Sequence, residues 1–463
     1  MITPRFTCSQ TAESVVISIY CPSVRAADVE IHVDKTLVSV HINPYFLRLN
    51  LSHSLQEDDA SSAQYDPGSG YLTITLTKHV HGQHFEDLDL LAKLLAPRPV
   101  LPPKQPIIEL LDRDEAAEAD LSSQTQELAV DDEEQQELLE AARNDWQLPQ
   151  EVLEPTPLKL TPQCYYGFLD MYSGYFTNVS YTENEVNELG VDAERCTPED
   201  RRPKRILHED EKWDSEHYMA DFAEDEYIQE LIKWRHPHTE GPVDPKFAEK
   251  ENAMMLNLPR KEYLPSQRQT HNLYLTLLTV LFAYAYDSRT TQHDPTPESA
   301  WTLCTLVPAF SALDPGPYTS TVWDPSSAFH REEIAAVFIP SYRRSLSFPL
   351  YRSFALAQKC RDDVAKFIAR GKRTVLKCLL EMKNILDHHE VYYVYSKIWL
   401  DDYCVWIQTH ASDEMLSRLA SAVETTEIQK TSIGWHLDQI EAIVHNIQIE
   451  RNMDSDDADS DDE

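Results

Sequence analysis

The feature that most constrains the fold is a long stretch, Arg343 to Gln408, in which apolar residues recur at helical spacing. Steps of three and four residues place one set of side chains on a single helix face: Leu350, Phe354, Ala357, Val364 and Phe367. Gly371 favours a helix stop, although the apolar positions from 375 to 386 keep nearly the same phase, so one kinked helix is the alternative. We predict two helices, the first capped by Ser347 with Pro349 in its first turn.

Residues 1–97 have a different period, because apolar and polar residues alternate one by one in several short runs. The runs are Val15–Ile19, Val29–Val33, Leu37–Ile42, Phe46–Leu51 and Tyr71–Thr77. Turn residues, such as those at 66–70, separate them. Many short strands without long helices between them predict an antiparallel β-sandwich. We expect a short helix, Glu86–Leu95, to close this domain.

Charge restricts the kind of partner. The chain has 78 acidic and 41 basic residues, a net charge of −37, and this excess repels nucleic acid and acidic membranes. A basic protein surface is the partner that such a chain favours. The simpler alternative is that the excess serves solubility and marks acidic disordered segments. The most apolar segment, Leu273–Tyr286, is too short to span a bilayer and indicates a buried helix.

The eight cysteines are scattered and form no C-x-x-C pair. This usage predicts reduced thiols in a cytosolic or nuclear protein. Residues 1–5 lack the charged and then apolar pattern of a signal peptide.

Two segments are too acidic to build a core. Between Glu109 and Glu154 there are sixteen acidic residues and two arginines, so residues 98–155 are predicted to be an acidic disordered linker. A short docking motif for a basic partner is the alternative there. Residues 451–463 are predicted to be an acidic disordered tail, with seven carboxylates in the last ten residues. Ser455 and Ser460 lie among these acids and are candidates for phosphorylation by an acid-directed kinase.

Residues 156–450 are predicted to form an all-α domain. Thr182-Glu183-Asn184-Glu185 resembles a capping box before a helix that ends at Gly190, and Thr197-Pro198 marks another helix start. Three more segments have helical patterns: Tyr227–Trp234, His271–Tyr286 and Met415–Val423. A final seam at heptad steps is expected to pack on the domain: Ile433, Leu437, Ile440, Val444 and Ile447.

No residue set in the sequence has the spacing of a catalytic or metal site, so we predict no enzyme activity and no cofactor. Gly371-Lys372-Arg373-Thr374 lacks the upstream glycine and strand of a phosphate loop. His79, His81 and His84 have no carboxylate or cysteine beside them, which favours a surface cluster over a metal site. The basic run Arg201–Arg205 is either a nuclear import signal or a surface turn, and it is too small for RNA binding.

Several segments resemble a known family. The first two lie in the sandwich region: Asn43-Pro44-Tyr45-Phe46-Leu47-Arg48-Leu49 and Gly82-Gln83-His84-Phe85-Glu86. The others lie in the helical region: Tyr166-Gly167-Phe168, His217-Tyr218-Met219-Ala220-Asp221-Phe222, Tyr284-Ala285-Tyr286-Asp287-Ser288-Arg289-Thr290, Glu298-Ser299-Ala300-Trp301, Arg343-Arg344, Pro349-Leu350-Tyr351-Arg352, Val375-Leu376-Lys377-Cys378-Leu379-Leu380 and Asp402-Tyr403-Cys404-Val405-Trp406-Ile407-Gln408. The first set is similar to the CS domain of the H/ACA ribonucleoprotein assembly factors, and the second to their helical domain.

The resemblance implies an assembly chaperone that binds the free pseudouridine synthase of H/ACA particles, the dyskerin type, before RNA is loaded. The helical domain would keep the synthase soluble and occupy its basic RNA-binding surface, and the CS domain would contact other assembly-machinery proteins. We expect a monomer in the nucleoplasm with a cytoplasmic pool. Our candidate contact residues are Tyr351, Arg352, Asp401, Asp402, Tyr403 and Trp406.

Each candidate has a core role as its alternative, and for Trp406 the core role is favoured. Two other functions remain open. A general co-chaperone would join a heat-shock ATPase through the CS domain and hold clients on the helical domain. An enzyme would need a site that the sequence does not reveal.

Overall fold

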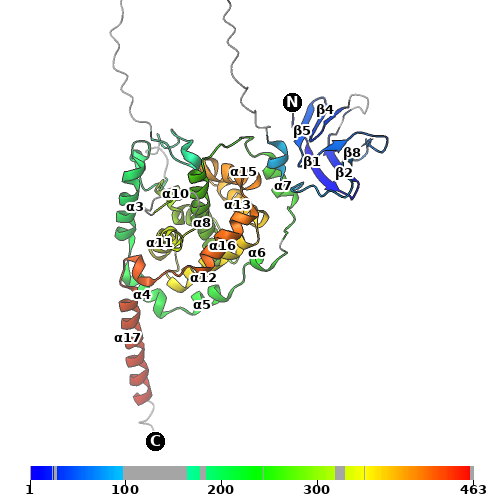
Figure 1. Cartoon of the computed structure of the whole chain (residues 1–463). Helices are drawn as coiled ribbons and strands as arrows, with labels where there is room; N and C mark the ends of the chain where they lie inside the picture. The colour runs from blue at the N-terminus through cyan, green and yellow to red at the C-terminus, as the bar shows by residue number, and fades with distance from the viewer. Residues whose placement is uncertain are drawn as a thin grey trace, which may run out of the picture. The chain divides into compact units, whose positions relative to one another are not determined.

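The N-terminal region forms the predicted antiparallel sandwich. The computed structural model describes residues 2–22, 24, 29–96, 164–177, 184–242, 244–318, 329–348 and 350–458, with side chains to residue 447. The eight strands are β1 Arg5–Gln10, β2 Ser14–Tyr20, β3 Glu30–Asp34, β4 Leu37–Ile42, β5 Tyr45–Asn50, β6 Leu55–Gln56, β7 Ser62–Asp66 and β8 Tyr71–Lys78. One sheet has the order β1-β2-β8-β6 with β7 also paired to β8, and the other has the order β3-β4-β5 (Figure 1).

The alternation seen in the sequence sets which side chains enter the sandwich. Val15, Ile17 and Ile19 on β2 are fully buried, and Ile17 is paired with Ile74 on β8. Because successive strand residues point to opposite faces, Val16 and Ser18 between them lie on the other face and are half-buried. The hydrophobic period therefore determined both the strand positions and the pairing register.

The closing helix is shorter than predicted. It is α1, Leu91–Leu95, and the segment before it, from residue 86, makes turns. Asp87 has φ of 61°, which no helix permits, and its carboxylate lies 2.7 Å from Lys93 Nζ and 2.7 Å from Lys372 Nζ. The two lysines, together with the buried Phe85 before Asp87 and Leu88 after it, hold this turn in place of a first helical turn.

Sixteen α-helices and shorter 3₁₀ or π segments lie in the described residues, fifteen of the helices after residue 164. They are α3 Pro198–Lys212, α4 Ser215–Ala223, α5 Glu226–Lys233, α6 Pro237–Glu240, α7 Glu249–Leu256, α8 Gln267–Thr290, α9 Ser299–Leu306, α10 Pro308–Ser311, α11 Arg331–Ser347, α12 Phe354–Ala369, α13 Lys372–Asp387, α14 Tyr393–Tyr395, α15 Asp401–Thr409, α16 Asp413–Thr425 and α17 Leu437–Ala458. The all-α prediction for this half of the chain is confirmed.

The core of the helical domain is built around α8. Every residue from Leu273 to Arg289 is buried, so this helix is covered on all sides. Its neighbours are α9, α11, α12 and α13 (Figure 1). The apolar segment Leu273–Tyr286 is thus the buried helix that we predicted, and no described helix is long and apolar enough to cross a membrane.

Gly371 separates α12 from α13, as predicted. Its φ of 86° lies in the left-handed region, and an added Cβ would meet the Asp413 carboxylate at 2.7 Å, so only glycine fits. The predicted cap was wrong: Ser353, not Ser347, accepts a hydrogen bond from the Leu356 amide and begins α12. Ser347 is instead the last residue of α11, and a loop separates it from the first residue of α12, Phe354.

One other helix prediction needs correction. Residues 184–189 form turns, and a 3₁₀ helix, Gly190–Glu194, begins where the predicted helix was to end. Thr182 lies outside the described residues. By contrast, Pro198 occupies the first turn of α3 as expected. The predicted short helix in the 227–234 region is confirmed as α5.

The C-terminal tail prediction also needs correction. Helix α17 continues to Ala458, into the segment that we expected to be unstructured. The acidic composition of this segment does not predict where the helix ends. Once a helix has begun on a packed segment, adding further residues is favourable until a residue stops it, and no glycine or proline follows Leu437. Of the predicted seam, Ile433, Leu437 and Val444 are buried and pack on the domain, whereas Ile447 is exposed. The predicted linker, residues 98–155, and residues 459–463 lie outside the described part.

The basic run Arg201–Arg205 does not form the surface turn that was one of its two predicted roles. It lies in α3, where Arg201 and Arg205 are buried. Arg205 Nε lies 2.8 Å from Asp314 and its NH1 lies 2.6 Å from Glu209, and both carboxylates are buried as well. Sequence spacing could not show this, since the partner Asp314 is more than a hundred residues away.

Candidate partner-binding site

The predicted contact residues near residue 400 lie in the core. A short π-helical segment, Ser396–Leu400, leads directly into α15. Tyr403 and Trp406 are fully buried, and the Trp406 ring packs edge-on against Tyr274, with centroids 4.9 Å apart. The Tyr403 hydroxyl donates to the Leu273 carbonyl oxygen at 3.0 Å. These positions agree with the core alternative and leave neither ring free for a partner in this state of the chain.

Asp402 is a buried carboxylate with three partners. Its Oδ1 accepts from Lys261 Nζ at 2.9 Å and from the Tyr263 hydroxyl at 2.5 Å, and its Oδ2 accepts from the Tyr172 hydroxyl. Burial, together with the negative charge of Asp402, raises the pKa of Tyr172 and Tyr263. Both phenols therefore stay protonated and act as donors that hold the carboxylate.

Asp401 points to a different set of cations. It pairs with Lys383 and lies 3.1 Å from Lys397 Nζ. Burial alone would lower the pKa of Lys383, but its hydrogen bond with Asp401 raises it above the usual value. Both acids of the predicted site therefore form ion pairs within the chain.

Tyr351 and Arg352 lie nearer the surface, in the loop between α11 and α12. The Arg352 amide donates to Asp221 Oδ2 at 2.8 Å, and the Tyr286 hydroxyl donates to the Tyr351 carbonyl oxygen at 2.9 Å. These two bonds fix the loop on α4 and α8. The loop thereby presents Leu350 to solvent, with 78% of its surface exposed.

The loop borders a groove of about 380 Å³, which we call the Tyr351 groove. Its lining residues are Glu185, Tyr286, Thr290, Glu298, Trp301, Thr302, Phe348, Leu350 and Tyr351. The floor is aromatic and apolar, whereas Glu185 and Glu298 are exposed acids. Tyr227 of α5 is 43% exposed and packs against Tyr351. An apolar floor with an acidic rim fits an apolar side chain that is flanked by basic residues.

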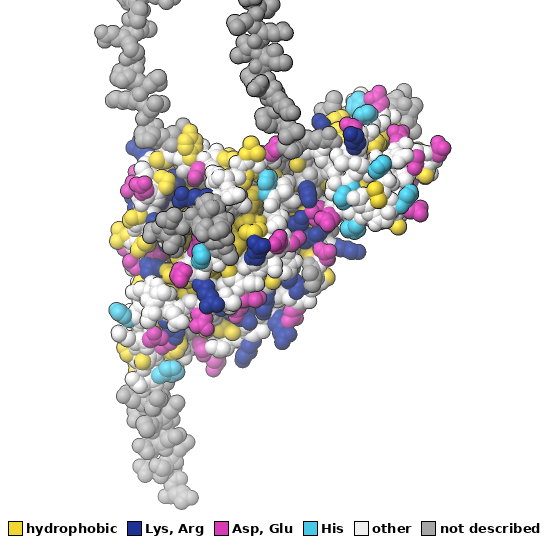
Figure 2. All heavy atoms as spheres, viewed as in Figure 1, with side chains coloured by type: hydrophobic (Ala, Val, Ile, Leu, Met, Phe, Trp, Pro, Cys, Tyr) yellow, Lys and Arg dark blue, Asp and Glu magenta, His cyan; other side chains and the backbone are white. Residues whose placement is uncertain are grey.

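One face of the helical domain mixes charges. On the face shown in Figure 2, acidic and basic side chains are interspersed over the helical domain. Sixteen of the chain's 78 acidic residues lie between Glu109 and Glu154, and seven lie in the last ten residues. Much of the acidic excess thus belongs to the linker and tail, and specific contact needs a shaped surface such as the groove.

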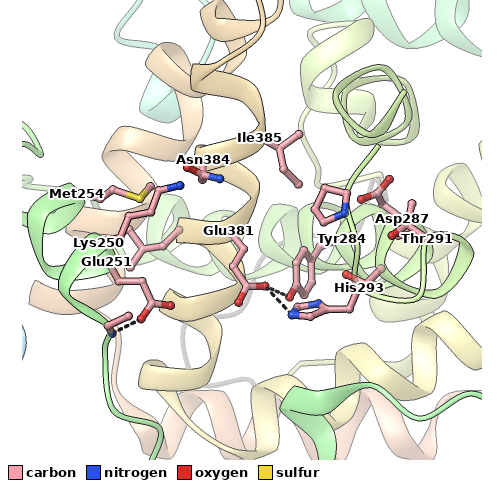
Figure 3. Close-up of a pocket in the computed structure, with 14 residues that line it drawn as sticks. Lys250, Glu251, Met254, Tyr284, Asp287, Thr291, His293, Glu381, Asn384 and Ile385 are labelled. Carbon is pink, nitrogen blue, oxygen red and sulfur yellow. Dashed lines mark hydrogen bonds and ion pairs between the residues drawn. The ribbon is translucent and has the colours of Figure 1, made fainter. Parts of the chain in front are cut away.

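A second cavity, of about 340 Å³, lies between α7, α8 and α13 (Figure 3). Glu381, Tyr284 and His293 meet at its wall. The spacing of these residues carries no signal of a site, since Tyr284 and His293 lie in or just after α8 and Glu381 lies in α13. The histidines that were candidates by sequence, at 79, 81 and 84, are exposed, and no metal-ligand group in the described residues includes them.

The remaining sequence predictions concern cysteines and serines. All eight cysteines are free thiols, and seven are buried. Ser455 falls within α17, where side chains are not described, and Ser460 lies outside the described residues. Phosphorylation at these serines stays a prediction, and mass spectrometry of the cellular protein that finds both serines always unmodified would refute it.

The architecture defines a two-domain protein in which a CS-type sandwich precedes an all-α domain. Residues 3–95 match the family model "SHQ1-like, CS domain", and residues 236–437 match "SHQ1 protein, Shq1 domain". Protein shq1 of Schizosaccharomyces pombe is 36% identical over 459 residues, which cover 96% of each chain. A Protein SHQ1 homolog of Xenopus tropicalis is 31% identical, over 97% of this chain and 70% of its own, and one of Mus musculus is 30% identical, over 97% and 76%.

The chain therefore belongs to the SHQ1 family, a family of H/ACA ribonucleoprotein assembly factors. The family resemblance inferred from the sequence is confirmed. The family is not a known enzyme family.

Proposed function

We propose that this assembly factor binds the free pseudouridine synthase of H/ACA particles, of the dyskerin type, and occupies its basic RNA-binding surface until RNA is loaded. The helical domain carries this contact and keeps the synthase soluble. The CS domain contacts other proteins of the assembly machinery. The protein works in the nucleoplasm and has a cytoplasmic pool.

The Tyr351 groove is the observation that carries the proposal. A leucine exposed to 78% beside two tyrosines and a tryptophan is an unusual arrangement for a surface that no partner covers. Aromatic residues at such a surface supply most of the binding energy in protein interfaces. Tyr351, which was chosen from the sequence, lines this groove, and Arg352 is its neighbour in the loop; contact by these two residues stays a prediction.

Charge explains why the partner would be a protein that otherwise binds RNA. A surface that binds the phosphate backbone is rich in lysine and arginine. The exposed acids Glu185 and Glu298 on the groove, with Glu224 and Glu226 beside Tyr227, complement such a surface. When this acidic chain is bound, its carboxylates reduce the electrostatic repulsion among the basic side chains of the synthase. The bound chain also excludes RNA from that surface.

The test is a binding titration of the full chain against the purified synthase without RNA. Leu350→Lys places a cation in the groove and should weaken binding at least tenfold, because it removes an apolar contact and repels a basic partner. Leu264→Lys is the matched control, since Leu264 is exposed to 91% and lies outside the groove. Equal loss in the two variants would reject the groove as the contact, and no binding by the unaltered chain would reject the partner.

If the unaltered chain does not bind the synthase, the general co-chaperone becomes the better explanation. Binding of the isolated CS domain to a heat-shock ATPase would then support it directly.

A further inference from the structure

Three potential metal ligands from separate segments meet beside the cavity of Figure 3. His238 lies in the short helix α6, His293 follows the end of α8, and Glu381 lies in the middle of α13. One ligand atom of each lies within 4.8 Å of those of the other two. Among the described residues, this is the only group of histidine, cysteine and carboxylate side chains with such spacing.

The distances suit a small tetrahedral ion after minor side-chain movement. His238 Nε2 lies 2.8 Å from Glu381 Oε1, and His293 Nε2 lies 3.9 Å from Glu381 Oε2. Zinc with bonds of about 2.0–2.1 Å to nitrogen and oxygen places its ligand atoms about 3.4 Å apart. The His238–Glu381 distance would have to lengthen and the His293–Glu381 distance to shorten, each by about half an ångström. Small χ rotations toward the cavity are enough for both changes.

The backbone brings His293 to this position in an uncommon conformation. Gln292 and His293 both have positive φ, 51° and 66°, and the His293 amide donates to the Ser288 carbonyl oxygen at 2.8 Å. Two successive non-glycine residues in the left-handed region are costly for the fold. In Figure 3 the imidazole that this turn presents points toward Glu381.

A second set of residues orients the ligands. The Tyr284 hydroxyl donates to Glu381, and the buried His236 accepts a hydrogen bond from the His238 amide at 3.0 Å through Nδ1. Arg370 donates to the Thr239 carbonyl oxygen at 2.7 Å and holds the end of α6. Hydrogen bonds of this kind fix the direction of ligands in protein metal sites, and their loss weakens the metal affinity.

The charge around the cluster permits a cation. The buried guanidinium of Arg289 is paired with Asp363 at 2.6 Å, and its Nη1 donates to the carbonyl oxygens of Leu231 and Trp234. Asp287 and Glu251 add carboxylates to the cavity wall. Since His293 and Glu381 also line the cavity, a fourth position on the metal would face this space, where a water molecule completes a tetrahedron.

We propose that His238, His293 and Glu381 bind one Zn²⁺ ion, which clamps α6 and the turn after α8 to α13. Two imidazoles and one carboxylate are a ligand set that zinc accepts, with water in the open position. The site shares no lining residue with the Tyr351 groove, so its test is independent of partner binding.

The experiment uses the full chain without a polyhistidine tag, freed of metal with a chelator. Calorimetric titration with Zn²⁺ should give one ion per chain, and Co²⁺ at the same site should give the intense visible absorption of a tetrahedral ion. His293→Ala and Glu381→Gln should each weaken Zn²⁺ binding at least tenfold. His217→Ala, which removes an exposed histidine of α4, is the matched control and should bind as the unaltered chain does.

A second variant keeps the test decisive if a ligand substitution disturbs folding, which circular dichroism would report. Tyr284→Phe keeps all three ligands and removes only the hydrogen bond to Glu381, so it should weaken Zn²⁺ binding about 10–100-fold. The proposal is overturned if the unaltered chain takes up no stoichiometric Zn²⁺, or if neither His293→Ala nor Tyr284→Phe alters the affinity. In that case the cluster is only a histidine–glutamate ion pair.

Discussion

Tyr351 packs its ring against that of Tyr227, with centroids 5.4 Å apart and planes inclined by 47°. This contact joins the loop before α12, which lines the Tyr351 groove, to the helix α5. Burial and the neighbouring phenol raise the pKa of Tyr351, so it remains a neutral aromatic surface. A partner therefore meets aromatic rings held by two elements, with acids at the rim.

The acids at the rim should control how fast the synthase associates. Glu185→Lys together with Glu298→Lys should lower the association rate constant about tenfold at low salt and reduce its dependence on ionic strength, because electrostatic steering is lost. Stopped-flow measurement at several salt concentrations checks this. Glu199→Lys with Glu216→Lys changes the net charge equally on α3 and α4 and should have a smaller effect. Equal effects of the two pairs would show that only net charge matters.

The carboxylate of Asp402 should stabilise the fold rather than bind a partner. Asp402→Ala leaves the Tyr172 and Tyr263 hydroxyls without their acceptor and should lower the free energy of unfolding by about 3 kcal/mol. Urea denaturation measures the change. Asp192→Ala removes an exposed carboxylate that lies 3.4 Å from Lys204, and it should cost less than about 1 kcal/mol. A loss of synthase affinity in a folded, stable Asp402→Ala protein would contradict this account.

Substitutions of Trp406 distinguish a role in the core from a role in contacting the partner. Trp406→Ala should lower the free energy of unfolding by about 3–5 kcal/mol, because it empties a fully buried site beside Tyr274. Trp406→Phe should cost less, since much of the aromatic volume remains and the indole N–H has no partner among the described residues. Synthase affinity should be unchanged in Trp406→Phe. Weaker binding at unchanged stability would restore Trp406 as a contact residue.

Acid should weaken the fold through Glu188. Burial alone would raise the pKa of this carboxyl, but the charges and hydrogen bonds of Arg344 and His208 together outweigh burial and lower it from 4.5 to about 2. A depressed pKa in the folded state means that the stabilisation is complete above pH 4.5 and is lost as the pH falls from 4.5 toward 2. The loss should be on the order of 3 kcal/mol across this window.

Urea midpoints measured between pH 6 and pH 2 check this prediction. Glu188→Gln should flatten the dependence below pH 4.5, whereas Glu199→Gln on the exposed first turn of α3 is the matched control. An unaltered slope in Glu188→Gln would assign the acid sensitivity to other groups.

Local patterns predicted the parts of the fold that depend on local physics. Alternation placed the buried Ile17 and Ile74 strands, and Gly371 marked the boundary between two helices because a left-handed position requires glycine. The helix caps were less predictable. Ser347 and Ser353 are both suitable caps by type, and only the path of the loop decides between them.

The candidate site depended on contacts that sequence spacing does not contain. Asp401 and Asp402 look like surface acids, yet lysines and tyrosines from distant segments compensate their burial. Arg205 was likewise matched by Asp314. The same limit hid the cluster of His238, His293 and Glu381, whose members meet only when α6, α8 and α13 pack together.

The central claim is that this chain and RNA compete for one surface of the synthase. The most direct measurement is the affinity of the full chain for the purified synthase, titrated with increasing amounts of H/ACA RNA. The account predicts that the apparent dissociation constant rises in proportion to RNA concentration, and that RNA displaces the chain completely. Formation of a stable complex that holds the chain, the synthase and RNA together at unchanged affinity would contradict it.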